Sequence, residues 1–336
     1  MGLAPSERGI VKEFLNFEAW FSERGITPTI TQRLPSEYEK YMAASADWTI
    51  GRLLTWTTDY LKQHGSESPR LDAEVLLAEA RGCQRIMLYT MFDEIAPEPL
   101  RTAFRELVRR RAEGMPVAYL VGHKEFYSLD FRVTPDVLIP RPETEHLVVR
   151  LLDLLKARPA NEPPAEIADV GTGSGIIAIC AAKHAPAVRV TALDISPAAL
   201  ATAKENAAKH KVTERIEFVN SDLFAALVPD SRFDLIASNP PYVSTAELTN
   251  LAASVREHEP KVALEAGPRG TEIIERLLQQ AAERLRPGGW FLCEISPMIA
   301  AAVRDLVAVD PRWELFPTLK DLAGHPRVIQ MRRRAE

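Results

Sequence analysis

Hydrophobic residues recur at helical spacing near the start of the chain. In the first thirty residues, four of them would share one face of an amphipathic helix: Ile10, Phe14, Phe17 and Phe21. A turn-rich stretch that contains Pro28 and Pro35 follows them. This pattern predicts an N-terminal extension over residues 1–46, made of one amphipathic helix and a linker.

The next stretch, from Trp48 to about Gly114, has helical spacing throughout. Its first apolar residues share one helix face: Ile50, Leu53, Leu54 and Leu61. Ser68 and Pro69 are typical of an N-cap followed by a first-turn proline, and they precede a second helix over 71–80. A further helix around Phe104 can end at Gly114. We therefore expect a small helical bundle over residues 47–114.

The pattern then changes twice. Loosely alternating apolar residues over 116–140 predict a hairpin or extended linker, which we place at residues 115–141. From residue 142 to 336, a helix over 147–155 precedes short apolar strands that alternate with helical segments. The predicted strands are 167–170, 188–193, 216–219, 235–237 and 290–295. Such alternation is typical of a parallel α/β sheet.

Composition and charge narrow the class of protein. Of 336 residues, 46% are hydrophobic, and the formal net charge of −5 argues against nucleic-acid binding through bulk positive charge. The three cysteines are odd in number and far apart, which favours a reducing cytosol over a disulfide framework. We expect a soluble cytoplasmic protein without a signal peptide or a membrane span. The seven histidines show no metal-ligand spacing, so we expect no metal.

The sequence Asp-Val-Gly-Thr-Gly-Ser-Gly lies between a predicted strand and the apolar helix 176–182. Glycines let the backbone turn sharply, and the following helix N-terminus offers unpaired N–H groups with a partial positive charge. Nucleotide, NAD and S-adenosylmethionine sites share this pattern, and some matches are tight turns without a ligand. The candidate cofactor-binding residues here are Asp169, Gly171, Thr172, Gly173 and Gly175.

Two further carboxylates follow the next strands. Asp194 ends a strand 19 residues after Gly175, where an acidic side chain can accept both hydroxyl hydrogens of a ribose. Ser196 and Pro197 already supply a cap for the helix over 198–209, which would leave Asp194 free for a ligand. Asp222 follows the third strand and is a candidate for contact with an adenine amine, or a solvated loop residue.

The sequence Asn239-Pro240-Pro241-Tyr242 ends the fourth strand, at the carboxyl edge of the sheet beside the glycine turn. Two prolines fix the loop and remove two N–H donors, which leaves carbonyl oxygens to accept hydrogen bonds. The side-chain oxygen of Asn239 and the carbonyl of Pro240 can together accept both hydrogens of a planar –NH2 group, and Tyr242 can stack on it. As a bare turn, the same four residues would carry no function.

The glycine run, then Asp194, then Asn-Pro-Pro-Tyr resembles class I S-adenosylmethionine-dependent methyltransferases that act on exocyclic or amide –NH2 groups. Four further segments are similar to the PrmC/HemK family of release-factor glutamine methyltransferases: 116–127, 138–145 (Leu-Ile-Pro-Arg-Pro-Glu-Thr-Glu), 259–264 and 321–328. The resemblance covers about residue 47 to the end. Residues 1–46 lie outside the family pattern, and the loop 267–270 is a less usual form of the family's loop.

The resemblance implies a Rossmann-like methyltransferase domain with a seven-stranded, mostly parallel sheet, joined to an N-terminal helical bundle. Because all cofactor-type motifs lie after residue 165 and a small –NH2 clamp offers little surface for selection, we expect the helical region over 47–114 to recognise the protein substrate. The resemblance also implies methyl transfer from S-adenosylmethionine, giving S-adenosylhomocysteine, to the glutamine side-chain amide in the Gly-Gly-Gln motif of class 1 release factors. The catalytic residues would be Asn239, Pro240 and Tyr242, and Asn239 would also contact the cofactor. The substrate-binding residues would be Asn239, Pro240, Pro241, Tyr242, Arg141 and Glu143.

The implied partners are class 1 release factors, with no membrane and no nucleic-acid contact beyond contacts near the ribosome, and we expect a monomer. Three other functions stay open. A methyltransferase for a ribosomal-protein glutamine and one for a nucleic-acid amine would use the same –NH2 clamp. A non-catalytic cofactor-binding protein would keep the glycine turn without needing Asn239 and Pro240.

Overall fold

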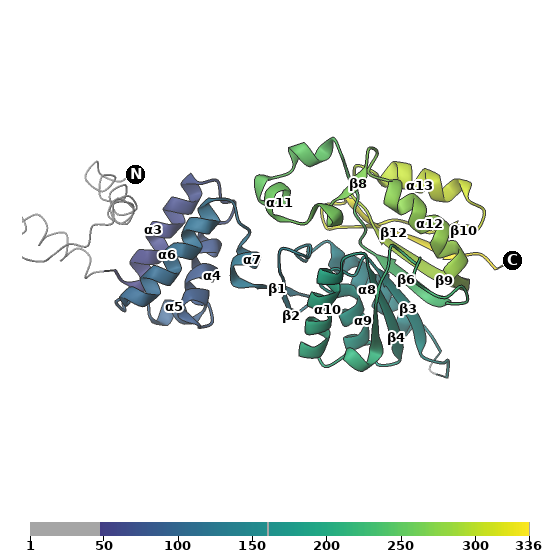
Figure 1. Cartoon of the computed structure of the whole chain (residues 1–336), viewed down its shortest axis with the longest axis horizontal. Coiled ribbons are helices and arrows are strands. Elements are labelled where there is room, and N and C mark those ends of the chain that lie inside the picture. The colour runs from purple at the N-terminus through teal and green to yellow at the C-terminus, as the bar shows by residue number, and fades with distance from the viewer. Residues whose placement is uncertain (1–47, 160, 336) are drawn as a thin grey trace, which may run out of the picture.

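The computed structural model describes residues 48–159 and 161–335. These residues form a helical domain and an α/β domain, which a short hairpin segment connects (Figure 1). The extension predicted over residues 1–46 lies outside the described residues. Of the described helices, none is both long and apolar enough to cross a membrane.

The helical domain confirms the expected N-terminal bundle. Its helices are α3 (Ile50–Gln63), α4 (Pro69–Arg81), α5 (Met87–Thr90) and α6 (Glu98–Ala112). A further short helix, α7 (Val117–Val121), lies in the stretch that the sequence predicted to be a hairpin or extended linker. The core of the helical domain contains fully buried side chains such as Leu54, Leu77 and Leu88, with Phe104 from α6 packed among them. Each such side chain contributes about 1.5–3 kcal/mol when it leaves water.

The start of α4 differs from expectation in one detail. Pro69 is the first helical residue, as predicted, but the side chain of Ser68 makes no capping hydrogen bond, because its backbone (φ −131°, ψ 57°) departs from the extended cap conformation. The hydroxyl of Ser66 instead donates to Oδ2 of Asp72 in the first turn, at 2.7 Å.

The predicted linker contains a hairpin of two antiparallel strands, β1 (His123–Phe126) and β2 (Leu129–Arg132). The two turn residues, Tyr127 and Ser128, have φ of 50° and 58°. Positive φ at both positions matches the tight turns that suit the twist of a hairpin. The amide of Tyr127 also donates to Oε1 of Glu145 at 3.1 Å, which attaches this turn to the next helix.

The α/β domain contains the mostly parallel sheet that the sequence predicted. Its strand order is β10-β12-β9-β6-β3-β4-β5, and a short strand, β11 (Leu319–Lys320), pairs with β12 outside this path. The parallel strands are β3 (Ala165–Val170), β4 (Val188–Asp194), β5 (Ile216–Asn220), β6 (Phe233–Ser238) and β9 (Leu285–Glu294). Antiparallel neighbours complete the edge: β12 (Pro326–Arg333) and β10 (Trp313–Leu315). The path therefore has the seven expected strands, and β11 is an eighth that the sequence did not predict.

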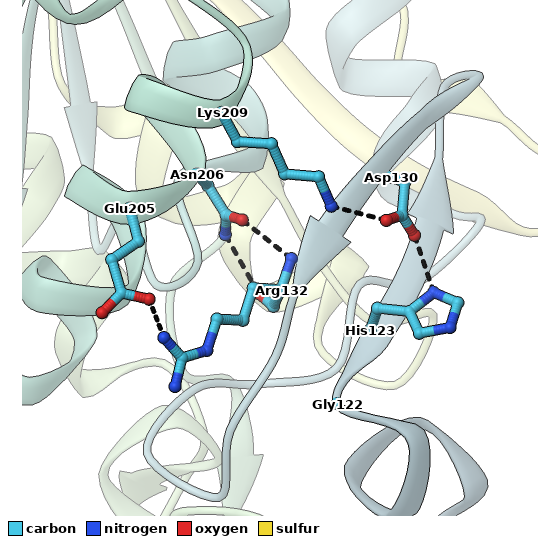
Figure 2. A pocket seen from close by; sticks show the side chains of 7 residues that line it. All are labelled: Gly122, His123, Asp130, Arg132, Glu205, Asn206 and Lys209. Carbon is cyan, nitrogen blue, oxygen red and sulfur yellow. Dashed lines mark hydrogen bonds and ion pairs between the residues drawn. The ribbon is translucent and has the colours of Figure 1, made fainter. Parts of the chain in front are cut away.

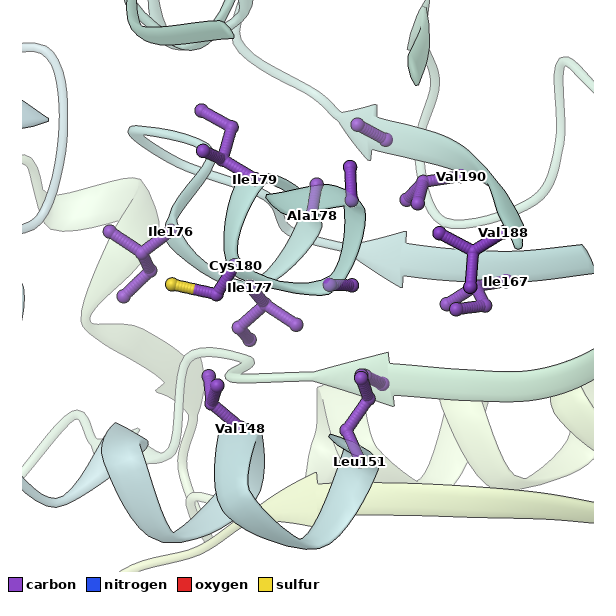
Figure 3. Close-up of a cluster of buried hydrophobic side chains, with 14 of the residues drawn as sticks. Val148, Leu151, Ile167, Ile176, Ile177, Ala178, Ile179, Cys180, Val188 and Val190 are labelled. Carbon is purple, nitrogen blue, oxygen red and sulfur yellow. The ribbon is translucent and has the colours of Figure 1, made fainter. Parts of the chain in front are cut away.

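Helices cover both faces of this sheet (Figure 1). The helices α8 (Thr144–Lys156), α9 (Ile176–His184) and α10 (Pro197–Lys209) lie on one face, and α12 (Glu272–Arg284) and α13 (Ala300–Val309) on the other. Successive strand residues point to opposite faces, so Ile167 joins the first core and Ala168 the second. Figure 3 shows the first core, where side chains of α8 and α9 meet those of β3 and β4.

Smaller elements follow the end of β6 in the sequence. The strands β7 (Val243–Ser244) and β8 (Glu265–Gly267) form a parallel pair. Between them lie η2 (Glu247–Asn250), α11 (Ala253–His258) and η3 (Lys261–Ala263), whereas η1 (Thr213–Arg215) precedes β5. The hydrophobic pattern predicted none of these short elements.

Candidate active site

The glycine turn connects β3 to α9 at the carboxyl edge of the sheet. Gly171, Gly173 and Gly175 have φ of 74°, 55° and 86°, a region that favours glycine. Gly175 is also constrained by packing, because an added Cβ would lie 2.9 Å from Cδ1 of Ile179 and 3.2 Å from Cβ of Ala203. The turn can therefore take this course only with glycine at its last position.

Asp169 is fully buried beneath this turn. Its Oδ2 accepts hydrogen bonds from the Thr172 hydroxyl at 2.6 Å and from the Ala178 amide at 3.0 Å. Its Oδ1 has no hydrogen-bond partner among the described residues. Burial is the main reason that the pKa of Asp169 is raised to about 7. S-adenosylmethionine carries an ammonium and a sulfonium, so an unpartnered carboxylate oxygen at this turn fits a cationic ligand.

Asp194 ends β4 next to the turn. The sequence predicted that its carboxylate would be free for a ligand, but backbone amides of the protein bind it. Its Oδ2 accepts from the Gly173 amide at 2.8 Å, and its Oδ1 accepts from the Ser196 amide at 2.9 Å. The prediction that Ser196 would cap the next helix is confirmed, since its hydroxyl accepts from the Ala199 amide at 3.2 Å. From the sequence, only side-chain caps were considered, and the backbone amides were left out as donors to Asp194. Each carboxylate oxygen keeps a further acceptor position, so a ribose contact stays a prediction.

Asp222 lies beyond the end of β5, in an exposed ion pair. Its Oδ2 contacts Nη2 of Arg276 on α12 at 2.7 Å. The neighbouring Ser221 amide donates to the carbonyl of Asp194 at 2.9 Å. The backbone after β5 therefore contacts the end of β4, whereas the Asp222 carboxylate contacts Arg276. The contact between Asp222 and an adenine amine stays a prediction.

The structure brings the Asn-Pro-Pro-Tyr loop beside the glycine turn, as the strand order requires. Val170 and Ser238 are paired in the parallel ladder of β3 and β6, and the Ser238 hydroxyl donates to the Val170 carbonyl at 2.7 Å. A Cβ added to Gly171 would lie 3.8 Å from the backbone oxygen of Asn239. Val170 and Ser238 are 68 residues apart in the sequence. Their pairing brings the glycine turn and the Asn-Pro-Pro-Tyr loop together at one site.

Asn239 has a fixed side-chain orientation within this site. Its Nδ2 donates to the Thr144 hydroxyl oxygen at 3.1 Å. The carbonyl oxygen shares the same amide carbon and points in a different direction, so it is not engaged by Thr144 and can accept a hydrogen bond from a ligand. This is the orientation that an –NH2 clamp requires.

Tyr242 is mostly buried, and its hydroxyl points to a carboxylate that sequence reasoning missed. The hydroxyl donates to Oε1 of Glu294, the last residue of β9, at 3.5 Å. Burial raises the pKa of Tyr242 above its ordinary value. The stacking role predicted for the ring stays a prediction. The signal for Glu294 was available, since it is an acidic residue within the apolar predicted strand 290–295.

Arg141 and Glu143 both form ion pairs inside the protein. Nη2 of Arg141 lies 2.5 Å from Oε1 of Glu259, a buried carboxylate that also accepts from the Ile139 amide at 3.3 Å. Oε1 of Glu143 lies 3.6 Å from Nη2 of Arg327 on β12. These pairs join the segments 138–145, 259–264 and 321–328 to one another. The substrate contacts predicted for Arg141 and Glu143 stay predictions.

A separate cleft of about 450 Å³ lies between the hairpin and α10 (Figure 2). Its charges form ion pairs between the hairpin and α10: Asp130 contacts Lys209 at 2.5 Å, and Arg132 contacts Glu205. Within the hairpin, the His123 ring also contacts Asp130 at 2.7 Å. The seven residues that line it are Gly122, His123, Asp130, Arg132, Glu205, Asn206 and Lys209. These pairs join the hairpin to the α/β domain. Over residues 48–159 and 161–335, no group of three or more His, Cys, Asp or Glu side chains could hold a metal ion.

The fold and the two joined motifs define a class I S-adenosylmethionine-dependent methyltransferase. Among solved structures, the hMettl16 catalytic domain in complex with the MAT2A 3′UTR hairpin 6 has the same fold, with a TM-score of 0.50 and 16% identity. That match covers 68% of this chain and 82% of the other. The chain also matches two family models, the PrmC N-terminal domain over residues 52–122 and the methyltransferase small domain over residues 150–265.

Curated relatives narrow the class to one family. A release factor glutamine methyltransferase from Rhodopirellula baltica is 53% identical over 286 residues, which are 85% of this chain and 97% of that protein. Another from Koribacter versatilis is 44% identical over 80% of this chain and 93% of that protein. The chain belongs to the family of release factor glutamine methyltransferases, as its motifs predicted.

Proposed function

We propose that the protein transfers a methyl group from S-adenosylmethionine to the side-chain amide nitrogen of the glutamine in the Gly-Gly-Gln motif of class 1 release factors. Its place of action is then the cytoplasm, and the products are the N-methylated glutamine and S-adenosylhomocysteine. The observation that carries this proposal is the orientation of Asn239. Its amide nitrogen is occupied by Thr144, so its oxygen is available for an –NH2 group.

An amide nitrogen is a poor nucleophile, because its lone pair is delocalised into the carbonyl. S-adenosylmethionine supplies an electrophilic methyl group on a sulfonium. Positive charge develops on the nitrogen during attack, and two acceptors that hold both N–H bonds stabilise that charge and aim the lone pair. The Asn239 side-chain oxygen and the Pro240 carbonyl are these acceptors. The methylated amide is strongly acidic while it keeps its extra proton, so no dedicated base is needed.

The cofactor site of this proposal is the glycine turn with its carboxylates. The residues that would hold the cofactor are Asp169, Gly171, Thr172, Gly173, Gly175, Asp194 and Asp222, with Asn239 at the reacting end. Two of them, Asp169 and Asp194, also hold the turn itself through backbone hydrogen bonds. We expect no metal in this reaction.

The helical domain would recognise the release factor. A small –NH2 clamp offers little surface with which to select one protein, so specificity needs a second contact area. Exposed apolar side chains lie close together in the sequence around α5: Ile86, Met87, Tyr89, Phe92 and Ile95. Exposed apolar side chains that form a contiguous patch are typical of protein contacts, so we propose these residues as the contact area for the release factor.

The test is mass spectrometry of a purified class 1 release factor after incubation with this enzyme and S-adenosylmethionine. One added methyl group on the peptide that contains Gly-Gly-Gln is the expected result. Parallel reactions with a ribosomal-protein substrate, tRNA and rRNA test the alternative methyl acceptors. Methylation of one of those, with an unmodified release factor, would contradict the proposal.

A further inference from the structure

Three polar side chains from distant parts of the sequence meet behind the Asn-Pro-Pro-Tyr loop. Thr144 is the first residue of α8, Asn239 follows β6, and Glu294 ends β9. Asn239 Nδ2 donates to the Thr144 hydroxyl oxygen at 3.1 Å, and Thr144 lies near enough to Glu294 for its side chain to lower the pKa of that carboxyl. Thr144 and Glu294 are 0% and 1% exposed, so water does not compete for these contacts.

The direction of hydrogen bonds among these three groups follows from the number of available protons. An ionised carboxylate can only accept, and a threonine hydroxyl has a single proton to donate. If Thr144 gives that proton to Glu294, its oxygen can only accept from Asn239. The amide of Asn239 must then present its nitrogen to Thr144 and its oxygen in a different direction.

We propose that Glu294 and Thr144 are positioning residues for methyl transfer: the buried carboxylate of Glu294 fixes the Thr144 hydroxyl, which in turn aims the Asn239 carbonyl oxygen at the substrate amide. This inference rests on the proposed function. It also assigns a role to the threonine of the Arg-Pro-Glu-Thr-Glu segment, because that threonine lies at the start of α8 between the two other groups.

The surroundings of Glu294 make its charge sensitive to pH. Burial is the main cause that raises its pKa to about 7, and Glu143 raises it further, whereas Arg327 and the side chains of Thr144 and Tyr242 lower it. The neighbouring Cys293 is a buried thiol with a raised pKa. Oε2 of Glu294 has no hydrogen-bond partner in the described structure, which leaves a position for a proton.

Protonation of Glu294 would reverse the chain of hydrogen bonds. A neutral carboxylic acid can donate to Thr144, which frees the threonine proton for the oxygen of Asn239. The Asn239 amide could then rotate, and its oxygen would no longer face the substrate. The methylation rate should therefore rise with pH through about 7 and level off above it.

The experiment measures single-turnover methylation of an intact release factor by the full chain, at saturating S-adenosylmethionine and from pH 6 to 8.5. Thr144→Val should lower the rate roughly 10- to 100-fold, as the loss of preorganisation at an acceptor does. Thr144→Ser, which keeps the hydroxyl, should retain most of the rate. Glu294→Gln should lose the rise in rate near pH 7, because its amide does not ionise there.

Thr57→Val is the matched control, since Thr57 is also 0% exposed but its hydroxyl has no hydrogen-bond partner in the described structure. Its methylation rate should equal that of the wild type. The double variant Thr144→Val, Glu294→Gln should be no slower than the slower single variant, because both substitutions interrupt one chain. A full rate for Thr144→Val, or an unchanged pH profile for Glu294→Gln, would overturn the inference.

A second measurement separates this inference from the proposed function. The side-chain amide of Asn239, observed by NMR in asparagine-labelled protein, should shift as the pH passes through about 7, and Thr144→Val should abolish that shift. A wild type that shows the shift but leaves release factors unmethylated would refute the proposed substrate and keep the hydrogen-bond chain. A wild type that methylates without the shift would refute the chain alone.

Discussion

The side-chain amide of Asn206 on α10 forms hydrogen bonds with both backbone groups of Arg132, the last residue of β2. Its Oδ1 accepts from the Arg132 amide at 2.7 Å, and its Nδ2 donates to the Arg132 carbonyl at 3.0 Å (Figure 2). The same Nδ2 donates to the Ser174 carbonyl in the glycine turn at 2.9 Å. One fully buried side chain thus joins the hairpin, α10 and the cofactor-side turn.

Asn206→Ala should lower the free energy of unfolding by about 2–4 kcal/mol, since it leaves buried backbone groups without partners. It should also weaken S-adenosylmethionine binding, because the turn at Ser174 loses its attachment. Urea unfolding and calorimetry measure the two effects. Glu205→Gln, in an exposed pair with Arg132, is the control and should cost less than about 1 kcal/mol. Equal stability of the two variants would contradict this role of Asn206.

Asp194→Ala should weaken S-adenosylmethionine binding by about 1.5–3 kcal/mol. The variant loses a carboxylate for the ribose and the acceptor that holds the Gly173 amide. Asp222→Ala removes a carboxylate that already pairs with Arg276, so its effect should be smaller. Calorimetric titration gives both affinities. Cofactor affinity that is unchanged in Asp194→Ala would remove this residue from the site.

Asn239→Ala should leave cofactor affinity nearly intact and lower the single-turnover methylation rate roughly a hundredfold or more, because one transition-state acceptor is lost. Rapid quench with labelled cofactor measures the rate, and calorimetry the affinity. Loss of cofactor binding with the rate preserved would show that the –NH2 clamp has been assigned to the wrong residues.

The combined substitution Ile86→Ser, Ile95→Ser should raise KM for an intact release factor about tenfold, whereas a short Gly-Gly-Gln peptide should be methylated as poorly as before. Both side chains are more than 60% exposed in the helical domain and are not needed for its core. Val309→Ser on α13 is the matched exposed control, at 80% exposure. An unchanged KM would move recognition to the hairpin and to the loop after Tyr242.

The raised pKa of Asp169 predicts a pH dependence of stability. Its folded pKa of about 7 lies above the ordinary 3.8. At a pH between these two values, the folded state therefore keeps a proton on Asp169 that the unfolded state has lost. The free energy of unfolding should fall as pH rises from about 4 to about 7 and then stay level for this group. Asp169→Asn should reduce that slope, measured by denaturant unfolding at pH 5 and pH 8. An equal slope in both proteins would contradict the assignment.

Much of the α/β domain could be predicted because its signals are local. The apolar strand 167–170 lies within β3 (Ala165–Val170), and the helix predicted over 198–209 is α10 (Pro197–Lys209). Strand order then placed Asn239 beside Gly171, since parallel strands end at the same edge. The short elements between β7 and β8 escaped prediction because they are too short for a hydrophobic period.

The candidate site was predictable in its motifs but not in its internal bonds. Asp194 was expected to be free because only side-chain caps were considered, yet two backbone amides bind it. Thr144 and Asn206 were missed because their roles depend on residues far away in the sequence, whereas Glu294 had a local signal as an acidic residue in an apolar strand. A buried polar side chain shows its function only when its partners are known.

The position of β12 in the sheet has a consequence for synthesis of the chain. The strand lies between β9 and β10, so β9 has an open edge until residues 326–333 have been made. During translation, the parallel strands β3 to β9 emerge first and expose this edge, a template for pairing with other chains. Loss of the last strand by premature termination would therefore produce aggregation rather than a smaller working enzyme. Nascent chains that end before residue 326 are the form most in need of a chaperone.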